Sequence, residues 1–269
     1  MTRPYAEVIG DPIVQSKSPA IHRFWLNALG IDGDYRAAHV TAAELADYIA
    51  ARRGDPSWRG CNVTMPHKQA VMALLDRIDP LAARIGAVNT VVRDAAGVLT
   101  GFNTDAPGFA EPLGDATLHG ATVVGAGGAA RAILLALAER GVGRIALMNR
   151  NVDKARALLD ELGIAGEAFA LGARVAAADL LVNSSSLGMV GHPPLPEGLL
   201  DDVIPGGLVY DIVTSPLRTQ LLEQAAARGL RTIDGLAMLI GQADHAFARF
   251  FGQHPPRGRD ADLRALICA

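Results

Sequence analysis

The sequence predicts an α/β protein of two domains. Strand-like and helix-like segments alternate nearly throughout the 269 residues, which is the pattern of βαβ units. A glycine-rich turn joins a strand to a helix near the middle of the chain. A long apolar helix near the C-terminus has no strand after it, so we expect it to pack back on the first domain, which would then be discontinuous.

The first domain is predicted over residues 1–104. We expect strands over 5–10, 34–40 and 59–65, helices over 18–30, 41–53 and 66–76, and a β-hairpin over 87–105.

The second domain is predicted over residues 105–235, with residues 236–269 completing the first. We expect strands over 121–125, 144–150, 178–186, 207–213 and 231–233, and helices over 127–141, 151–163 and 219–229. This succession implies a parallel sheet with right-handed crossovers. The long terminal helix is expected over 236–252.

Composition excludes several classes of protein. Half of the residues are hydrophobic, 20% are charged and the net charge is −3, which fits a compact enzyme. Lys and Arg form no basic stripe, so we expect no nucleic-acid partner. Neither a signal-peptide core in MTRPYAEVIG nor a run of roughly 18 apolar residues is present, so we expect a cytoplasmic protein that does not span a membrane. Cys61, Cys268 and the dispersed histidines predict neither a disulfide framework nor a metal site.

The strongest local signal is TVVGAGGAARA, residues 122–132. An apolar strand ends at Gly125, and Gly127 and Gly128 precede a helix, so the backbone can approach a pyrophosphate at the helix N-terminus. A tight turn without a ligand is the alternative. The strand–turn–helix context favours a Rossmann-type dinucleotide site.

The next strand indicates which dinucleotide binds. NAD sites place a carboxylate at the end of that strand, whereas RIALM is followed by Asn149 and Arg150, with Lys154 one turn on. An Arg at this position suits a 2′-phosphate, because its fork pairs with phosphate oxygens. Two solvated surface cations are the alternative. We predict NADP rather than NAD or S-adenosylmethionine.

Four further residues could carry chemistry. Ser16 and Ser18 precede Pro19, and they either cap a helix or receive a carboxylate. Lys68 and Asp105 lie far apart in the sequence, and Asp105 falls where the first domain gives way to the second, a place where clefts form. A Lys beside a carboxylate can supply the proton that a carbonyl gains on reduction. Taken singly, Lys68 is better explained as a surface Lys, and Asp105 as a turn-capping Asp.

Together these segments resemble the shikimate dehydrogenase family, in order and over nearly the whole chain. The segments that carry the resemblance are GDPIVQSKSPAIH, NVTMPHK, AVNTVV, GFNTD, GAGGAAR, MNRNVDKA, VNSSSLGM, DIVTSPLRTQLL and TIDGLAMLIGQA. The family fold has two α/β domains, with the C-terminal helix returning to the first.

The resemblance implies a role for each matching residue. Substrate-binding residues would be Ser16 and Ser18 at the carboxylate, and Thr64, Asn89 and Gln242 at the ring hydroxyls. Lys68 and Asp105 match the catalytic pair. Cofactor-binding residues would be Gly125, Ala126, Gly127, Gly128 and Ala129 at the pyrophosphate, Asn149, Arg150 and Lys154 at the adenosine phosphate, and Ile212 and Gly235 at the nicotinamide.

Four places depart from the family pattern. Gln15 stands where His is common, His67 replaces Phe, and Ala106 and Pro107 follow Asp105 where Gly is usual. Thr214 stands where the family has a Tyr that contacts the substrate. Losing that phenol would cost affinity of about tenfold.

The resemblance implies an NADP-dependent enzyme that interconverts 3-dehydroshikimate and shikimate, as a monomer or homodimer. Thr214 leaves open a paralogue that oxidises quinate or a related ring acid. A catalytically silent NADP-binding regulator is the alternative from another class, and a methyltransferase is a more distant one.

Overall fold

The computed structural model describes residues 3–268, and these residues divide into two compact units. Unit 1 contains the described residues up to Thr104 and those from Gln242 onward, and unit 2 is Asp105–Gly241. We expected the second boundary between residues 235 and 236. It lies six residues later because helix α8 (Gly235–Phe251) is continuous, and the chain passes from one unit to the other within it.

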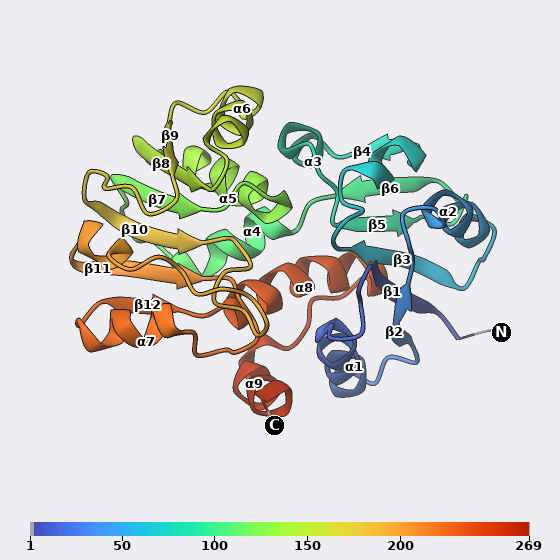
Figure 1. Cartoon of the computed structure of the whole chain (residues 1–269). Coiled ribbons are helices and arrows are strands. Elements are labelled where there is room, and N and C mark those ends of the chain that lie inside the picture. The colour runs from blue at the N-terminus through green and yellow to red at the C-terminus, as the bar shows by residue number, and fades with distance from the viewer. Residues whose placement is uncertain (1–2, 269) are drawn as a thin grey trace. The chain divides into compact units, whose positions relative to one another are not determined.

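The sheet of unit 1 is mixed, and its strand order is β2-β1-β3-β5-β6-β4. The strands are β1 Tyr5–Gly10, β2 Asp34–His39, β3 Trp58–Val63, β4 Arg77–Ile78, β5 Thr90–Arg93 and β6 Leu99–Phe102 (Figure 1). Strands β1, β2 and β3 are parallel, whereas β5 runs antiparallel to both β3 and β6. The expected hairpin is confirmed. The start of β5 therefore lies at the same edge of the sheet as the carboxyl ends of β1 and β3.

Helices cover both faces of this sheet. The helical elements of unit 1 are α1 Ser18–Leu29, α2 Leu45–Arg53, α3 Pro80–Ile85, α9 Asp260–Cys268, the 3₁₀ turns η1 Ala70–Leu74 and η4 Arg257–Arg259, and α8 from Gln242 onward. Side chains alternate along β1, so Tyr5 and Ile9 join the core under α2, η1 and α3. Ala6 and Val8 face the other way, where they pack with Phe250 of α8.

One predicted helix is wrong. Residues 65–69 form turns, and only Ala70–Leu74 is helical, as a 3₁₀ turn. The carbonyl of Lys68 accepts a hydrogen bond from the N–H of Val88 at 2.8 Å, and the N–H of Met72 bonds to Gln69 instead. A tertiary contact has taken the backbone group that an α-helix would need.

The sheet of unit 2 is entirely parallel, with the order β12-β11-β10-β7-β8-β9. The strands are β7 Gly120–Val124, β8 Arg144–Asn149, β9 Glu167–Ala170, β10 Ala178–Asn183, β11 Val203–Asp211 and β12 Arg231–Ile233 (Figure 1). The order is that of the Rossmann fold, which places the end of its first strand, β7, at the switch point where dinucleotides bind. The edge strand β9 was not predicted.

Helices also cover both faces of the second sheet. They are α4 Asp105–Ala110, α5 Gly128–Glu139, α6 Val152–Leu162, α7 Gln220–Ala227 and the turns η2 Glu111–Leu113 and η3 Leu199–Asp202. Along β11, Tyr210 stacks on Phe109 of α4, with ring centroids 4.9 Å apart. Its neighbour Val209 faces the opposite side and packs with Leu221 and Leu222 of α7.

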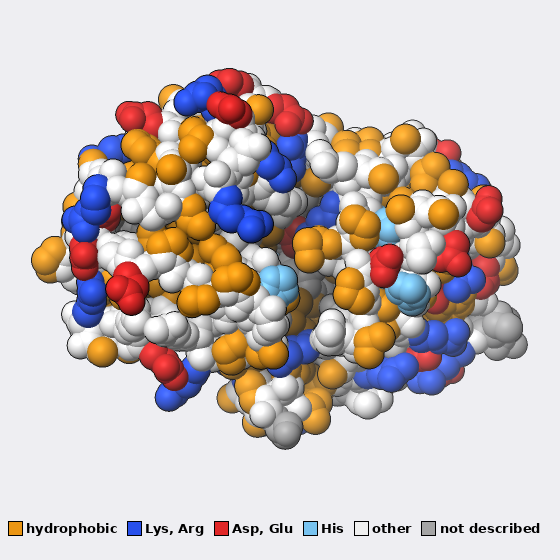
Figure 2. Space-filling view, viewed as in Figure 1, with side chains coloured by type: hydrophobic (Ala, Val, Ile, Leu, Met, Phe, Trp, Pro, Cys, Tyr) orange, Lys and Arg blue, Asp and Glu red, His pale blue; other side chains and the backbone are white. Residues whose placement is uncertain are grey.

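The surface carries both signs of charge. On the face shown in Figure 2, acidic and basic side chains are interspersed over both units. Among residues 3–268, no helix combines the length and the apolar character that crossing a bilayer requires.

Candidate functional site

The turn that carries Lys68 is fixed at the carboxyl edge of the first sheet. It begins where β3 ends, and the N–H of Thr64 donates to the carbonyl of Ile9 on β1 at 2.9 Å. The N–H of His67 then donates to the carbonyl of Thr64, and the carbonyl of Lys68 receives the N–H of Val88. The backbone of Lys68 is thus held at both sides, while its side chain is half-buried.

His67 anchors this turn from the side. It is buried, and its Nε2 lies 2.6 Å from the carbonyl oxygen of Val40, just after β2. A carbonyl can only accept, so Nε2 carries the proton and donates. The residue that departs from the family pattern therefore ties the turn before Lys68 to the residue that follows β2.

Asn89 fixes the segment that leads to Asp105. Its Oδ1 accepts the backbone N–H of Thr104 at 2.7 Å, and its Nδ2 donates to the Thr104 hydroxyl at 3.0 Å. Thr104 directly precedes Asp105, which is the first residue of α4 and is buried. Val88 thus holds the carbonyl of Lys68, and the next residue, Asn89, holds the N–H of Thr104 before Asp105.

A buried polar chain extends behind Asn89. The Tyr35 hydroxyl donates to Asn62 Oδ1 at 2.6 Å, and Asn62 Nδ2 donates to the Thr90 hydroxyl at 3.0 Å. That hydroxyl lies 3.0 Å from Asn89 Oδ1. Buried networks of this kind rigidify the groups at their ends, here the Asn89 amide. Asn62 and Thr90 were not predicted, although polar residues in otherwise apolar strands were a signal for them.

Ser16 and Ser18 follow β1 at the same edge. Neither serine is the N-cap residue of α1, because Lys17 holds that position and makes no side-chain cap bond. Ser18 is the first helical residue and is buried, and its N–H donates to Ser16 Oγ at 3.4 Å.

The remaining predicted substrate residues lie on different elements. Thr64 is half-buried at the end of β3, and Gln242 is buried on α8 in unit 1. Thr214 is half-buried in the loop after β11, in unit 2. Unit 1 alone therefore brings five predicted residues to one edge of its sheet, next to the ends of β1 and β3 and the start of β5. They are Ser16, Ser18, Thr64, Lys68 and Asn89.

The glycine-rich turn has the geometry that a phosphate needs. Gly125 has a φ of +105°, and a Cβ built there would lie 3.1 Å from the Ser184 hydroxyl oxygen. A Cβ at Gly127 would meet open space, with no other atom within 4 Å. Gly127 is the N-cap of α5 and supplies no side-chain cap, so the N–H groups of Gly128 and Ala129 head the helix without a partner from the cap residue. Ala126 is buried behind them. The turn fits a pyrophosphate.

The end of β8 carries cations and no carboxylate. Arg150 and Lys154 are exposed, and within residues 3–268 neither side chain has an ion pair. Asn149 Nδ2 donates to the carbonyl of Asn151, whose own Oδ1 caps α6 by accepting the Lys154 N–H at 3.0 Å. The first carboxylate, Asp153, is paired with Arg156. This arrangement fits a 2′-phosphate better than a ribose hydroxyl.

The predicted nicotinamide end lies over β10 and β11. The N–H of Ile212 donates to the carbonyl of Asn183 at 3.1 Å. A Cβ at Gly235 would lie 2.4 Å from the carbonyl oxygens of Ile212 and Val213, so only glycine allows this close approach.

A second polar network, which the sequence analysis missed, supports these loops. Asp211 is buried, and burial raises the pKa of its carboxyl. It accepts hydrogen bonds from Asn183 Nδ2 at 2.9 Å, the Thr219 hydroxyl at 2.7 Å and the Val213 N–H at 3.1 Å. The network pins the loop that contains Thr214. An acidic residue that ends an apolar strand was its sequence signal.

No group of three or more His, Cys, Asp or Glu side chains in the described part of the chain is placed to hold a metal ion.

Two family models match the chain. The shikimate dehydrogenase substrate binding domain matches residues 8–91, and the shikimate/quinate 5-dehydrogenase domain matches residues 110–188.

Curated relatives match over nearly the full length. The chain is 60% identical to a shikimate dehydrogenase (NADP(+)) of Sphingopyxis alaskensis, over 99% of this chain and 97% of that one. It is 46% identical to a protein of the same name from Mesorhizobium japonicum, over 98% of this chain and 95% of that one.

Solved structures also match over nearly the full length of the chain. Shikimate 5-dehydrogenase of Thermus thermophilus in complex with NADP(H) and shikimate aligns with a TM-score of 0.85 and 37% identity, over 98% of this chain and 99% of that one. Quinate dehydrogenase of Corynebacterium glutamicum in complex with NAD aligns with a TM-score of 0.88 and 33% identity, over 98% and 99% of the two chains.

Proposed function

This chain belongs to the shikimate dehydrogenase family, and we propose that it catalyses the reversible NADP-dependent reduction of 3-dehydroshikimate to shikimate. The observation that carries the proposal is the 60% identity, over 99% of the chain, to a relative named shikimate dehydrogenase (NADP(+)). The chain is an oxidoreductase that uses NADP.

Unit 1 is proposed to bind the ring acid. The Ser16 and Ser18 hydroxyls would receive its carboxylate, and Thr64, Asn89 and Gln242 would bond to its ring hydroxyls. The common sheet edge of the loops that adjoin β1, β3 and β5 supports this assignment. Asn89 has part of its hydrogen-bonding capacity committed to Thr104, so its role includes holding the backbone as well as contacting substrate.

Lys68 and Asp105 are proposed to handle the proton. On reduction, Lys68 would donate a proton to the ketone oxygen, and on oxidation it would take the proton from the hydroxyl. Asp105 would orient the ammonium and balance its charge. The attachment of the Lys68 carbonyl to Val88 and of the Thr104 N–H to Asn89 supports the pairing, because it fixes both backbones to neighbouring residues.

Unit 2 is proposed to hold the cofactor. Bound NADP(H) supplies or accepts the hydride at the carbinol carbon. The turn Gly125, Ala126, Gly127, Gly128 and Ala129 would hold the pyrophosphate, and Asn149, Arg150 and Lys154 would hold the adenosine phosphate. Ile212 and Gly235 would border the nicotinamide. The open space beside Gly127 and the lack of an ion pair at Arg150 support these roles.

The alternatives are less well supported. The curated relatives between 41% and 60% identity carry the name shikimate dehydrogenase, whereas the quinate dehydrogenase structure is 33% identical. A silent regulator would have no use for both Lys68 and Asp105. A monomer or homodimer in the cytoplasm remains a prediction.

The test is an assay of the purified protein for shikimate-dependent NADP reduction, with quinate and NAD as comparisons. Lys68→Ala and Asp105→Asn should each lower kcat by about 10²-fold or more while NADPH affinity stays unchanged. Arg23→Ala is the control, since this exposed cation belongs to the same unit but pairs with Asp34. If the purified protein shows no shikimate-dependent NADP reduction, the proposed reaction is rejected. If both variants keep full activity, the roles of Lys68 and Asp105 are rejected.

A further inference from the structure

Unit 1 has a hollow at the edge of its sheet opposite the proposed substrate residues. Its volume is about 290 Å³, which suits a ligand with a single ring. The lining residues are Pro4, Ile31, Arg59, Arg93, Arg249, Phe250 and Phe251. Pro4 precedes β1, and Arg59 lies near the start of β3, whereas Ser16 and Lys68 follow the ends of these strands. The six residues of β1 separate the two edges by about 17 Å.

Three arginines line this hollow without a carboxylate among the lining residues. Within the described chain none of the three forms an ion pair with Asp or Glu. The closest carboxylates along the chain are already engaged. Asp32 pairs with Arg3, and Asp94 accepts the N–H groups of Ala96 and Val98.

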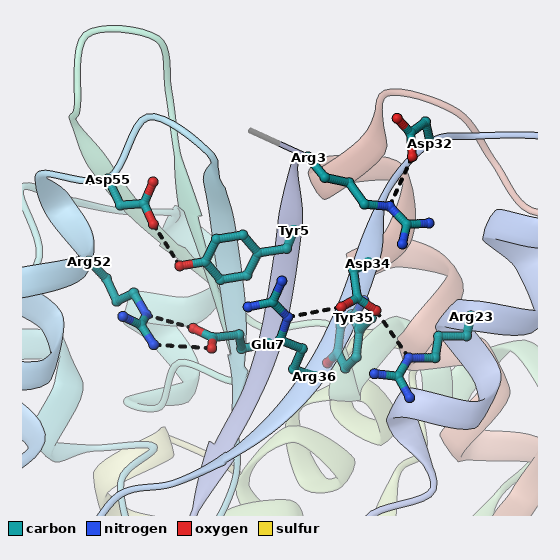
Figure 3. Close-up of polar contacts among 10 residues, drawn as sticks. All are labelled: Arg3, Tyr5, Glu7, Arg23, Asp32, Asp34, Tyr35, Arg36, Arg52 and Asp55. Carbon is teal, nitrogen blue, oxygen red and sulfur yellow. Dashed lines mark hydrogen bonds and ion pairs between the residues drawn. The ribbon is translucent and has the colours of Figure 1, made fainter. Parts of the chain in front are cut away.

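Four other arginines of unit 1 are paired with carboxylates. Arg3 pairs with Asp32, Arg23 and Arg36 both pair with Asp34, and Arg52 makes a two-pronged contact with the buried Glu7 (Figure 3). Every arginine drawn in Figure 3 thus has a carboxylate partner, whereas the three arginines of the hollow form no ion pair among the described residues, and Asp79 interacts with the charge of Arg249 only from a longer distance. Three guanidinium groups with so little compensating charge attract an anion.

The backbone directs Arg59 to this place. Tyr5 pairs with Trp58 and Ala6 pairs with Gly60, so Arg59 is the extra residue of a β-bulge. Bulges redirect a side chain out of the regular alternation of a strand. Within the described residues, Arg59 makes no hydrogen bond with other side chains or with the backbone, so its guanidinium remains available.

The other two arginines are held in place. Arg249 Nη1 donates to the His245 carbonyl at 2.7 Å, and its guanidinium lies 4.7 Å from the centroid of the Phe102 ring. Arg93 Nε donates to the Arg53 carbonyl at 2.8 Å. Each side chain uses only part of its five N–H donors on these contacts. Such preorganisation lowers the entropic cost of binding a ligand.

The rest of the wall is apolar. Phe250 is buried in the core with Ala6 and Val8, and Phe251 packs against it with the rings 6.3 Å apart at 78°. Pro4 and Ile31 complete this side. A ligand that fits both the arginines and the apolar wall carries an oxyanion on an apolar ring.

We propose that this hollow binds a small aromatic oxyanion, a ring that carries a phosphate or a carboxylate, at a site separate from the substrate site. The arginines would bond to the oxyanion, and the ring would lie against Phe250 and Phe251. The second negative charge of a phosphate favours it over a carboxylate, because three arginines line the hollow.

Isothermal titration of the full chain with phenyl phosphate, benzoate, inorganic phosphate and phenol tests this site. We expect one phenyl phosphate to bind per chain, more tightly than benzoate. Its affinity should exceed that of inorganic phosphate and that of phenol by about tenfold or more. Arg59→Ala and Arg249→Ala should each weaken phenyl phosphate about tenfold. Arg23→Ala removes the same charge from the exposed face of α1 and should leave binding unchanged.

Saturating shikimate and NADP should leave phenyl phosphate bound, because shikimate belongs at the other edge of this sheet and NADP belongs to unit 2. Displacement by shikimate, an equal loss in Arg23→Ala, or no saturable binding up to about 10 mM would each overturn the proposal. Failure of shikimate turnover would leave these titrations unaffected, so the two proposals can fail independently.

Discussion

The backbone N–H of Thr104 donates to Oδ1 of Asn89 at 2.7 Å, in the buried interior of unit 1. Thr104 is the last residue of unit 1 in the first half of the chain, and Asp105 follows it as the start of α4. Asn89, which is predicted to contact substrate, therefore also fixes the backbone directly before Asp105, the proposed catalytic carboxylate.

Replacing Asn89 with Ala should lower both stability and turnover. The Thr104 N–H would lose its buried acceptor, at a cost of about 1–3 kcal/mol. We expect a lower urea midpoint and a lower kcat, with NADPH affinity unchanged because the cofactor residues belong to unit 2. Asn27→Ala, at an exposed position of α1, is the control. A destabilised variant with wild-type kcat and KM would limit Asn89 to a structural role.

Replacing Arg150 with Ala should affect the two nicotinamide cofactors differently. A hydrogen bond to a charged group contributes about 1.5–3 kcal/mol, so NADPH affinity should fall about tenfold to a hundredfold. NADH affinity should hardly change, because NADH has no 2′-phosphate. Arg156→Ala removes an equally exposed charge two residues beyond Lys154, where it is paired with Asp153. Fluorescence titrations measure both affinities, and an equal loss for NADPH and NADH would contradict the assignment.

Stability should depend on pH through His22. This ring is buried, stacks on Tyr35 at 3.9 Å between centroids, and has no hydrogen-bond partner on either nitrogen within the described residues. Burial lowers the pKa of His22 from 6.5 to about 3. The unfolded chain then binds a proton at a higher pH than the folded chain. This contribution leaves stability unchanged above about pH 6.5 and lowers it by about 1.4 kcal/mol per pH unit as the pH falls from there towards 3.

His22→Phe should remove that slope, and it should leave no unpaired ring nitrogen in the core. Urea unfolding at several pH values, followed by tryptophan fluorescence, measures the effect within unit 1, because both tryptophans, Trp25 and Trp58, are buried there. His192→Gln, at an exposed position of unit 2, should keep the slope of the parent protein. A slope that survives in His22→Phe would assign the pH dependence to other groups.

Thr214→Tyr should restore the phenol that the family pattern has at this position. One added hydrogen bond is worth about 0.5–1.5 kcal/mol, so KM for shikimate should fall up to about tenfold. Thr214→Val removes the hydroxyl without adding a ring. It therefore separates the effect of losing the Thr214 hydroxyl from the effect of adding the Tyr ring. Steady-state rates with shikimate and quinate measure the outcome. If Tyr improves neither substrate, Thr214 does not tune the pocket.

Local periodicity predicted most of the fold. The alternation of strand-like and helix-like segments predicted a parallel sheet in unit 2, and the parallel pairing of β7, β8 and β10 is as expected. The glycine-rich turn and the cations after β8 were also predicted from the sequence, because each depends on residues that lie close together along the chain. The short elements were missed: β4, β9, α3 and α9 are too brief or too irregular to give a clear period.

The sequence by itself therefore determined the two-unit α/β architecture, the dinucleotide turn and the residue types available for catalysis, because each depends on neighbours within a few turns or strands. Only the tertiary structure decided how the Lys68 turn is held. Residues 66–76 have the apolar pattern of an α-helix, but the Lys68 carbonyl bonds to Val88 and His67 bonds to Val40, and neither partner is near in sequence. The same holds for the Asn89 bond to Thr104 and for the gathering of Arg59, Arg93 and Arg249. Such contacts depend on the path by which the chain returns to itself, and no local pattern carries that information.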